Sequence, residues 1–346
     1  CSCSPVVQSN VMSPGVFAGE AVISAAILDW MIGDPRRSLH PVVVMGWVIQ
    51  CIRTPIEQWA KDWPWRLRLG GGVITSLLVI GSGLMGWAIE RLIWTATPIA
   101  WVGWLIMVIG LASALAGRSL HHSVMAILHA IPATPKGNLD DARGKLSWIV
   151  GRDVQDLDRT GILRATTESA AENAVDGLFA PLFWMCVGTS LWQINPIFPG
   201  PLALAWAFKA SSTLDSMLGY RTDNLQWLGT AGARLDDLLT WLPCRLVMLT
   251  LPVVSYRWSH WLKLIQAAEQ DGKSDPSPNA GRSEAIYAHC VGVKLGGNNR
   301  YGQRWINKPI LAKTESDPDI AAVSSVLNLT VRLEILWLVA LFLVSQ

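Results

Sequence analysis

Two long stretches in the first third of the chain carry no charged residue. They cover residues 71–89 and 92–117, and only Glu90 and Arg91 separate them. Because a bilayer core is crossed by about 20 consecutive apolar residues of helix, each stretch predicts a membrane-spanning helix. The short charged interruption predicts that the two helices form a tight hairpin that turns at Glu90 and Arg91.

A third uncharged stretch covers residues 177–208, but proline and glycine interrupt it at 196–201. This pattern predicts either two membrane segments joined by a turn or one re-entrant pair. Three weaker candidates cover 16–32, 238–256 and 333–344. The first of these contains two acidic residues, and the last is short for a span.

The polar segments favour helices and loops rather than strands. Residues 271–279 are rich in Asp, Ser and Pro and predict a loop. No repeat or linker divides the chain, so we expect residues 1–346 to form one domain. The predicted fold class is all-α: a multi-pass helical integral membrane protein with polar helices and loops on the cytoplasmic side.

Composition supports this class. Hydrophobic residues make up 51% of the chain and charged residues 16%, whereas soluble domains carry roughly 25% charged residues. The mean hydropathy is positive. These values exclude a disordered chain, a collagen-like fibre and a disulfide scaffold. The six cysteines form no CxxC pair and are expected to be small hydrophobic residues. The formal net charge of +2 gives no reason to expect nucleic acid as a partner.

The distribution of Lys and Arg predicts the orientation in the membrane. These residues gather in 34–69, 118–177 and 257–332, and the interruption at 195–201 has none. Positive segments tend to remain in the cytoplasm, so we expect the cell membrane as the location and a cytoplasmic active face. A cytoplasmic 257–332 requires that 238–256 returns or lies in the interface, or that the number of spans differs by one.

Three acidic residues, Glu168, Glu172 and Asp176, follow one another at intervals of four. On a helix this spacing places them along one face, where like charges repel. A divalent cation relieves this repulsion, and Mg²⁺ prefers carboxylates together with substrate phosphates. The segment is therefore a candidate Mg²⁺–nucleotide site. A solvated acidic helix face is the alternative.

Two further polar groups follow the interrupted stretch. Lys209 suits phosphate, and Asp215 suits a metal or a polar substrate. Arg234 is followed by Asp236 and Asp237, and adjacent aspartates point to different faces of a helix, so only one needs to face a site. An ordinary cluster of interfacial ion pairs is the alternative for both groups.

Polar residues near the two ends of the chain complete the inventory. Asp29 and Asp34 lie at the end of the first apolar segment, with His40 shortly after it. Charges at the edge of a span tend to have a partner or a function. Near the other end, a Ser-Pro-Asn-Ala-Gly turn contains Asn279, and a second turn contains Gly296 and Gly297. Glycine turns expose N–H groups that suit anions, although both segments can be simple turns.

In this order, the groups resemble the CobD/CbiB family of cobalamin biosynthesis proteins, adenosylcobinamide-phosphate synthases. The resemblance extends from about residue 21 to about residue 309. It depends on Asp29, Gly33-Asp34-Pro35, His40-Pro41, Gly151-Arg152-Asp153, Glu168-Ser169, Glu172-Asn173, Asp176-Gly177, Lys209, Thr213-Leu214-Asp215-Ser216-Met217, Ala233-Arg234-Leu235-Asp236-Asp237, Ser277-Pro278-Asn279-Ala280-Gly281, Glu284-Ala285 and Leu295-Gly296-Gly297. Arg282-Ser283 and Asn298-Asn299-Arg300 depart from the family's usual residues, which leaves the fine substrate preference open.

The resemblance implies an ATP-dependent ligase that joins (R)-1-amino-2-propanol, or its O-phosphate, to a propionate of adenosylcobyric acid. The product is adenosylcobinamide or its phosphate. ATP and Mg²⁺ are the implied cofactors. Membrane lipid and other enzymes of the corrinoid pathway are the expected partners. Because a carboxylate does not accept an amine at neutral pH without activation, we expect an acyl-phosphate intermediate and a base that removes the proton of the amine.

The expected roles follow from this chemistry. We assign Mg²⁺ to Glu168, Glu172 and Asp176, and the base to Asp215, Asp236 or His40. The remaining candidates would bind substrate: Asn173, Lys209, Arg234, Asn279, Gly296, Gly297, Asp29 and Asp34.

Two other classes of function compete with the ligase. One is a non-enzymatic membrane regulator related to this family, of the AmpE type, which need not keep the acidic residues. The other is a transporter or scaffold for corrinoids, which would place charges within the central spans. The sequence leaves open whether the amine donor is phosphorylated and whether the protein works alone.

Overall fold

Several of the apolar helices begin at a proline. The computed structural model describes residues 13–346 except 34–39, 97–99, 135–136, 220–223 and 303. Pro14, Pro41 and Pro201 each lie in the first turn of a helix, where the missing N–H is not needed. The apolar helices are α1 (Pro14–Ile32), α2 (Pro41–Ala60), α3 (Pro64–Ala96), α4 (Ala100–Ala112), α8 (Ala180–Ile194), α9 (Pro201–Leu218), α11 (Thr230–Val254) and α14 (Ile320–Ser345).

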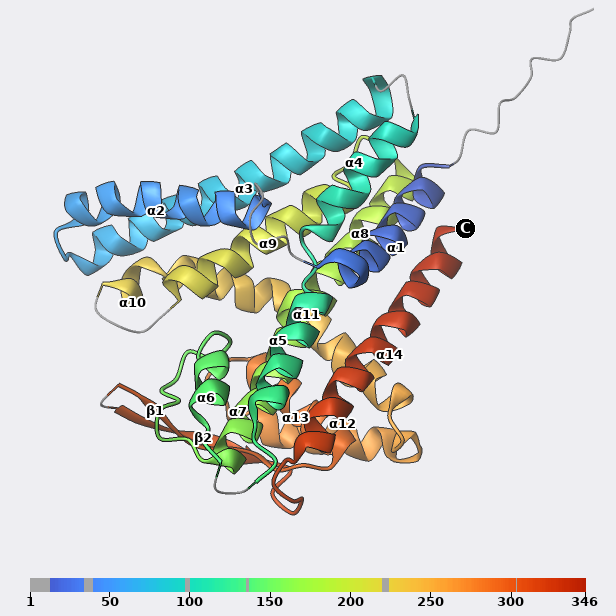
Figure 1. The fold of residues 1–346 in the computed structure, drawn as a ribbon. Helices are drawn as coiled ribbons and strands as arrows, with labels where there is room; N and C mark the ends of the chain where they lie inside the picture. The colour runs from blue at the N-terminus through green and yellow to red at the C-terminus, as the bar shows by residue number, and fades with distance from the viewer. Residues whose placement is uncertain (1–12, 34–39, 97–99, 135–136, 220–223, 303) are drawn as a thin grey trace, which may run out of the picture.

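Shorter and more polar elements occupy the other end of the molecule (Figure 1). They are α5 (Gly117–Ala130), α6 (Asp140–Leu146), α7 (Arg159–Ala174), α12 (Trp261–Gly272), α13 (Ala280–Val291) and the short helices η1 (Val175–Phe179) and η2 (Trp258–His260). The short helix α10 (Leu225–Leu228) lies instead against α3. Two strands, β1 (Leu295–Tyr301) and β2 (Arg304–Leu311), form an antiparallel hairpin beside α6 and α7.

Among the described residues, five helical segments are long and apolar enough to cross a membrane, or six if a bent pair counts as one span. The five are Pro14–Ile32, Pro64–Thr95, Arg159–Ile194, Thr230–Val254 and Ile320–Ser345. Large apolar side chains such as Leu77, Ile80 and Leu84 on α3 are exposed, as expected for a surface that faces lipid. The predicted class, a multi-pass helical membrane protein, is confirmed.

The hairpin predicted at Glu90 and Arg91 is wrong, because α3 continues through both residues to Ala96. Their charges are satisfied within the protein. The buried Glu90 carboxylate accepts hydrogen bonds from the N–H groups of Gly200, Leu202 and Ala203, at 2.7–3.2 Å. Arg91 donates to the Pro196 carbonyl at 3.2 Å. A carboxylate at the start of α9 compensates for unpaired N–H groups and favours that helix.

The interruption at 196–201 does separate two helices, α8 and α9, as one of the two predicted alternatives required. The β-hairpin was not predicted, because its first strand contains Gly-Gly-Asn-Asn and few residues that favour strands. Gly296 and Gly297 have φ values of +85° and +94°, and the strand pairing is irregular at this point. The weak candidate at 333–344 is the end of a longer helix, α14, which contains the buried Glu334.

Candidate active site

The acidic segment lies on α7 and on the π-helical turn that continues it. Asp158 caps the start of α7 by accepting a hydrogen bond from the Gly161 N–H at 2.7 Å. The helix then passes without a break into η1, which contains Asp176, and from there into α8. A π-helical turn inside a longer helix is rare and frequently marks a functional site. Here it sets the direction of Asp176 relative to Glu172.

Two adjoining cavities open beside this segment. The first chamber has a volume of about 540 Å³ and is also lined by α5, α9 and α11; the second has a volume of about 370 Å³ and is also lined by α13 and the β-hairpin. The chambers share a wall made of Ile149, Val150, Gly151, Asn173, Asp176, Asp215 and Ser216. A substrate group at the shared wall therefore contacts both chambers.

The first chamber combines carboxylates with one lysine and several hydroxyl groups. Asp236 joins Asp176 and Asp215 there, and Lys209 lies among them. Five serines also line the chamber: Ser119, Ser123, Ser147, Ser212 and Ser216. The Oδ1 atom of Asp236 is buried and has no hydrogen-bond partner among the described residues. An unpaired buried oxygen of this kind is costly, and a bound cation or donor would satisfy it.

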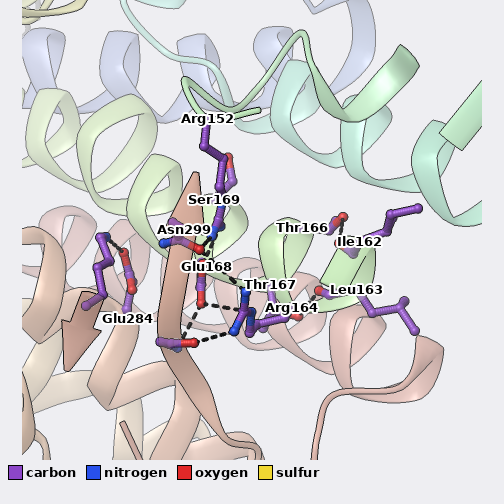
Figure 2. Close-up of polar contacts among 12 residues, drawn as sticks. Arg152, Ile162, Leu163, Arg164, Thr166, Thr167, Glu168, Ser169, Glu284 and Asn299 are labelled. Carbon is purple, nitrogen blue, oxygen red and sulfur yellow. Dashed lines mark hydrogen bonds and ion pairs between the residues drawn. The ribbon is translucent and has the colours of Figure 1, made fainter. Parts of the chain in front are cut away.

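Glu168 is held by the protein itself. Its carboxylate forms an ion pair with Arg152, and both side chains are buried. The other carboxylate oxygen accepts the Gly296 N–H at 2.8 Å. Arg152 also donates to the Asn299 side-chain oxygen, so Glu168 connects α7, the loop before it and strand β1 (Figure 2). These contacts hold the residues that line the second chamber in position.

Gly296 must be glycine for this contact to form. Its φ of +85° is unfavourable for other residues, and a Cβ atom would lie 1.9 Å from the Pro309 carbonyl oxygen. Its carbonyl accepts a hydrogen bond from Arg164 at 2.7 Å. The expected anion at this glycine turn is thus a carboxylate of the same chain, Glu168.

The second chamber contains a buried pair, Lys308 on β2 and Glu284 on α13, whose Nζ and Oε1 atoms are 2.9 Å apart. Asp275 lies 3.7 Å from the same Nζ. Burial by itself would lower the pKa of Lys308, but Glu284, Glu172 and Asp275 together raise it above its ordinary value. Burial is also the main reason why the pKa of Glu284 is raised to about 8. Lys308 is therefore a permanent cation.

Seven of the candidates from the sequence line the two chambers: Asn173, Lys209, Asp215, Asp236, Glu168, Glu172 and Asp176. Their convergence from α7, η1, α9 and α11 agrees with the expectation that they act together. Asp237 does not line either chamber and accepts a hydrogen bond from the Ser277 hydroxyl at 3.2 Å, although it is close enough for its charge to act on Asp215 and Asp236. The adjacent aspartates thus face different surroundings, as their spacing predicts.

Other candidates lie away from both chambers. Arg234 is exposed, and His40 precedes the first turn of α2. The Asn279 amide donates to the Asp237 carbonyl and accepts from Arg245 at 2.6 Å. Asp29 is buried and accepts the Gly117 N–H at 2.9 Å, at the start of α5. None of these four residues lines either chamber, so the expectation that they join the same site is corrected.

Asp34 lies outside the described residues, and Gly297 on β1 does not line either chamber. Within the described part of the chain, no group of three or more His, Cys, Asp or Glu residues has the arrangement needed to hold a metal ion without other ligands. Glu168 in particular is occupied by Arg152 and Gly296. The predicted three-carboxylate metal set of Glu168, Glu172 and Asp176 is therefore not formed by the protein alone.

Several residues of the chambers were not singled out as site residues from the sequence. They are Arg152, Glu284, Asn299, Lys308 and the five serines of the first chamber. Arg152 and Glu284 belong to motifs that carry the family resemblance, so a signal for them was present. Asn299 and Lys308 reach the chamber only because the β-hairpin folds against α7, and nothing in the sequence indicated that hairpin.

Comparisons with known proteins agree with this picture. The family model described as CobD/Cbib protein matches residues 22–330. The cobalamin biosynthesis protein CobD of Synechocystis sp. is 41% identical over 305 residues, which cover 87% of this chain and 84% of that protein. The cobalamin biosynthesis protein CbiB of Salmonella typhimurium is 35% identical over 307 residues, with coverage of 88% and 90%. No solved structure matches the chain.

Proposed function

The chain belongs to the CobD/CbiB family of cobalamin biosynthesis proteins, and from this premise we propose that it is an ATP-dependent amide ligase. Its substrates would be adenosylcobyric acid and (R)-1-amino-2-propanol, or the O-phosphate of that amine. The product would be adenosylcobinamide or its phosphate. The observation that carries the proposal is the pair of joined chambers, where carboxylates, a lysine and serines converge at the polar end of membrane helices.

The reaction needs an activated carboxylate. In the proposed sequence, an oxygen of the corrinoid propionate attacks the γ-phosphorus of ATP, and ADP leaves. The amine nitrogen then attacks the acyl carbon of the acyl phosphate, the carbon–oxygen bond to phosphate breaks, and the amine proton passes to a base. Such a sequence requires a phosphate site and an amine site on either side of one carboxylate, which is the arrangement that a shared wall provides.

The first chamber suits the phosphate end of a nucleotide. Lys209 offers a positive charge, and the five serines offer hydroxyl groups. Asp176, Asp215 and Asp236 are suitable ligands for Mg²⁺, which usually takes one or two protein carboxylates and completes its shell with phosphates and water. The unpaired Oδ1 atom of Asp236 supports this fit. Bound Mg²⁺ would supply neutralisation of phosphate charge.

Asp215 is the preferred base among the three original candidates. Of these three it alone lines both chambers, whereas Asp236 lines only the first chamber and His40 lines neither. The exposed Asn173 also belongs to the shared wall; its amide nitrogen donates to the Ser169 carbonyl and hydroxyl oxygens at 2.8 and 2.9 Å, which leaves its side-chain oxygen to accept a hydrogen bond from a substrate. Glu168 is reassigned from metal ligand to positioning residue.

The location of the chambers also supports a corrinoid substrate. The reaction requires only that a propionate side chain enters the chambers, so the macrocycle can remain outside them. The chambers adjoin helices whose exposed surface is apolar. We propose that the protein lies in the cell membrane with the chambers on the cytoplasmic side, where ATP is present.

The test is product formation by membranes that contain the overproduced chain. Adenosylcobyric acid, Mg²⁺ and ATP are supplied with (R)-1-amino-2-propanol or its O-phosphate in separate reactions, and corrinoid products are identified by mass spectrometry. We expect a product of amide mass only when ATP is present, with one ADP released per product. Amide formation without ATP, or no product with either amine, would contradict the proposed ligase.

A further inference from the structure

The two chambers differ in the charge of their walls. Five carboxylates line the second chamber, Glu168, Glu172, Asp176, Asp215 and Glu284, against the two cations Arg152 and Lys308. Both cations already have carboxylate partners, because Arg152 pairs with Glu168 and Lys308 pairs with Glu284 at 2.9 Å. Carboxyl groups therefore outnumber cations in this chamber, and because burial raises the pKa of Glu284 to about 8, a bound cation would stabilise the ionised carboxylates.

Two buried atoms of this wall lack a partner among the described residues. One is the Oε2 atom of Glu284, whose residue is 1% exposed, and the other is the amide Nδ2 of Asn299, whose residue is 3% exposed. They are an acceptor and a donor. Buried polar groups are nearly always hydrogen-bonded in folded proteins, so an unpaired acceptor and donor in one cavity indicate a ligand that carries both functions.

The contacts of the same residues explain why these two atoms remain available. The Oε1 atom of Glu284 is engaged by Lys308, and the Oδ1 atom of Asn299 accepts from Arg152, with Arg164 at 3.4 Å. Each side chain is thus fixed by one atom and presents its other atom without a protein partner in the described part of the chain. Glu172 lies in the same wall and adds a further carboxylate to it.

We propose that the second chamber is the subsite for the amine donor. Its ammonium group would lie between the carboxylates of Glu172 and Glu284, and the oxygen at its other end would accept a hydrogen bond from the Asn299 amide. The ligand class is a small primary amine with an adjacent alcohol or phosphate ester. This subsite rests on the proposed ligase function, and it places the amine opposite the nucleotide phosphates, across the shared wall.

The arrangement also separates the two substrates by charge. The ammonium occupies the chamber in which carboxyl groups outnumber cations, and the phosphates occupy the chamber that holds Lys209 and the serines. For the attack on the acyl phosphate, the ammonium must lose one proton, and Asp215 in the shared wall is in place to receive it. The nitrogen–carbon bond then forms as phosphate leaves, with ATP as the source of that phosphate.

The test uses the full chain in proteoliposomes and the variant Glu284→Gln. The Gln oxygen can still accept from Lys308, whereas its amide nitrogen would repel an ammonium group. We expect the KM for the amine to rise about tenfold or more, which is typical for the loss of a charged hydrogen bond, with little change in the KM for ATP. The reciprocal variant Ser212→Ala, in the first chamber, should raise the KM for ATP and leave the KM for the amine unchanged.

A ligand control distinguishes ammonium recognition from simple fit. The diol 1,2-propanediol has a hydroxyl group where the amine donor has its ammonium, and it should compete only weakly with (R)-1-amino-2-propanol. The variant Asn299→Asp keeps the oxygen that faces Arg152 but removes the amide donor. It should raise the KM for the phosphorylated donor more than the KM for the free amino alcohol, because the new carboxylate repels phosphate.

The outcomes separate this inference from the proposed function. If Glu284→Gln raises the KM for ATP and leaves that for the amine unchanged, or if the diol competes as well as the amine, the subsite assignment is wrong while the ligase function stands. If the wild-type protein forms no product, the ligase function fails. In that case, calorimetric titration of the purified protein with the amine tests the subsite. The subsite assignment predicts that the wild type binds the amine and that Glu284→Gln or Asn299→Asp does not.

Discussion

At the scale of single residues, equal spacing does not give equal roles. Glu168, Glu172 and Asp176 follow each other at intervals of four, and the sequence predicts one acidic face. In the structure, Arg152 and the Gly296 N–H occupy Glu168, whereas Glu172 and Asp176 are partly exposed to the chambers. The partners of Glu168 come from segments 16 and 128 residues away, which helical periodicity cannot reveal.

This difference leads to opposite expectations for two similar variants. Glu168→Ala leaves the buried Arg152 without its partner, and loss of one partner of a buried pair typically costs about 3–5 kcal/mol of unfolding free energy. Glu172→Gln removes a carboxylate that faces the chambers, so ligase turnover should fall while stability changes little. Thermal unfolding in detergent and turnover in membranes measure the two effects. If Glu172→Gln keeps full turnover with an unchanged KM for the amine, its proposed role is wrong.

At the scale of elements, uncharged stretches locate most of the apolar helices but not their ends. The helices at 16–32 and 238–256 were expected, and α1 and α11 contain most of these residues. The charged pair at 90–91 predicts a turn, yet α3 continues because Glu90 binds the start of α9. The β-hairpin is held by long-range contacts of Glu168 and Lys308, so local propensity could not indicate it.

Glu90 also provides a test at this scale. Glu90→Ala should destabilise the protein by about 1–3 kcal/mol, because three N–H groups near the start of α9 lose a charged acceptor in a buried position. Glu57→Ala on α2 is the matched control, since Glu57 forms a surface pair with Arg53. Thermal unfolding of both variants in the same detergent measures the difference. Equal losses of stability would show that the cap at α9 contributes nothing specific.

At the scale of the whole molecule, composition and charge predicted a membrane protein with one polar end, and Figure 1 shows the polar helices and the β-hairpin gathered there. The turn between α8 and α9 lies near the C-terminal end of α3, where Trp87 donates to the Ile197 carbonyl at 2.9 Å. The two chambers depend on contacts among α7, α9, α11 and the hairpin, so the sequence supplied candidates for the site but not its shape.

The orientation can be tested by chemical labelling. Ile197 and Gln155 are both exposed, one in the α8–α9 turn and the other in the loop before α7. In a background in which Cys1, Cys3, Cys51 and Cys186 are replaced by Ser, we expect Ile197→Cys to react with a membrane-impermeant maleimide added to intact cells. Gln155→Cys should react only after permeabilisation. The reverse pattern would place the chambers on the outer side of the membrane, away from ATP.

The most direct measurement of the central claim compares two neighbouring aspartates in reconstituted protein. Asp236 lines the first chamber with an unpaired buried oxygen, and Asp237 is hydrogen-bonded to Ser277 outside it. ATP-dependent formation of the corrinoid amide is followed by mass spectrometry. We predict that Asp236→Asn lowers turnover at least about a hundredfold, within the range of effects for groups that stabilise a transition state, and that Asp237→Asn retains most of it. Full turnover by Asp236→Asn would contradict the assignment of the reaction to these chambers.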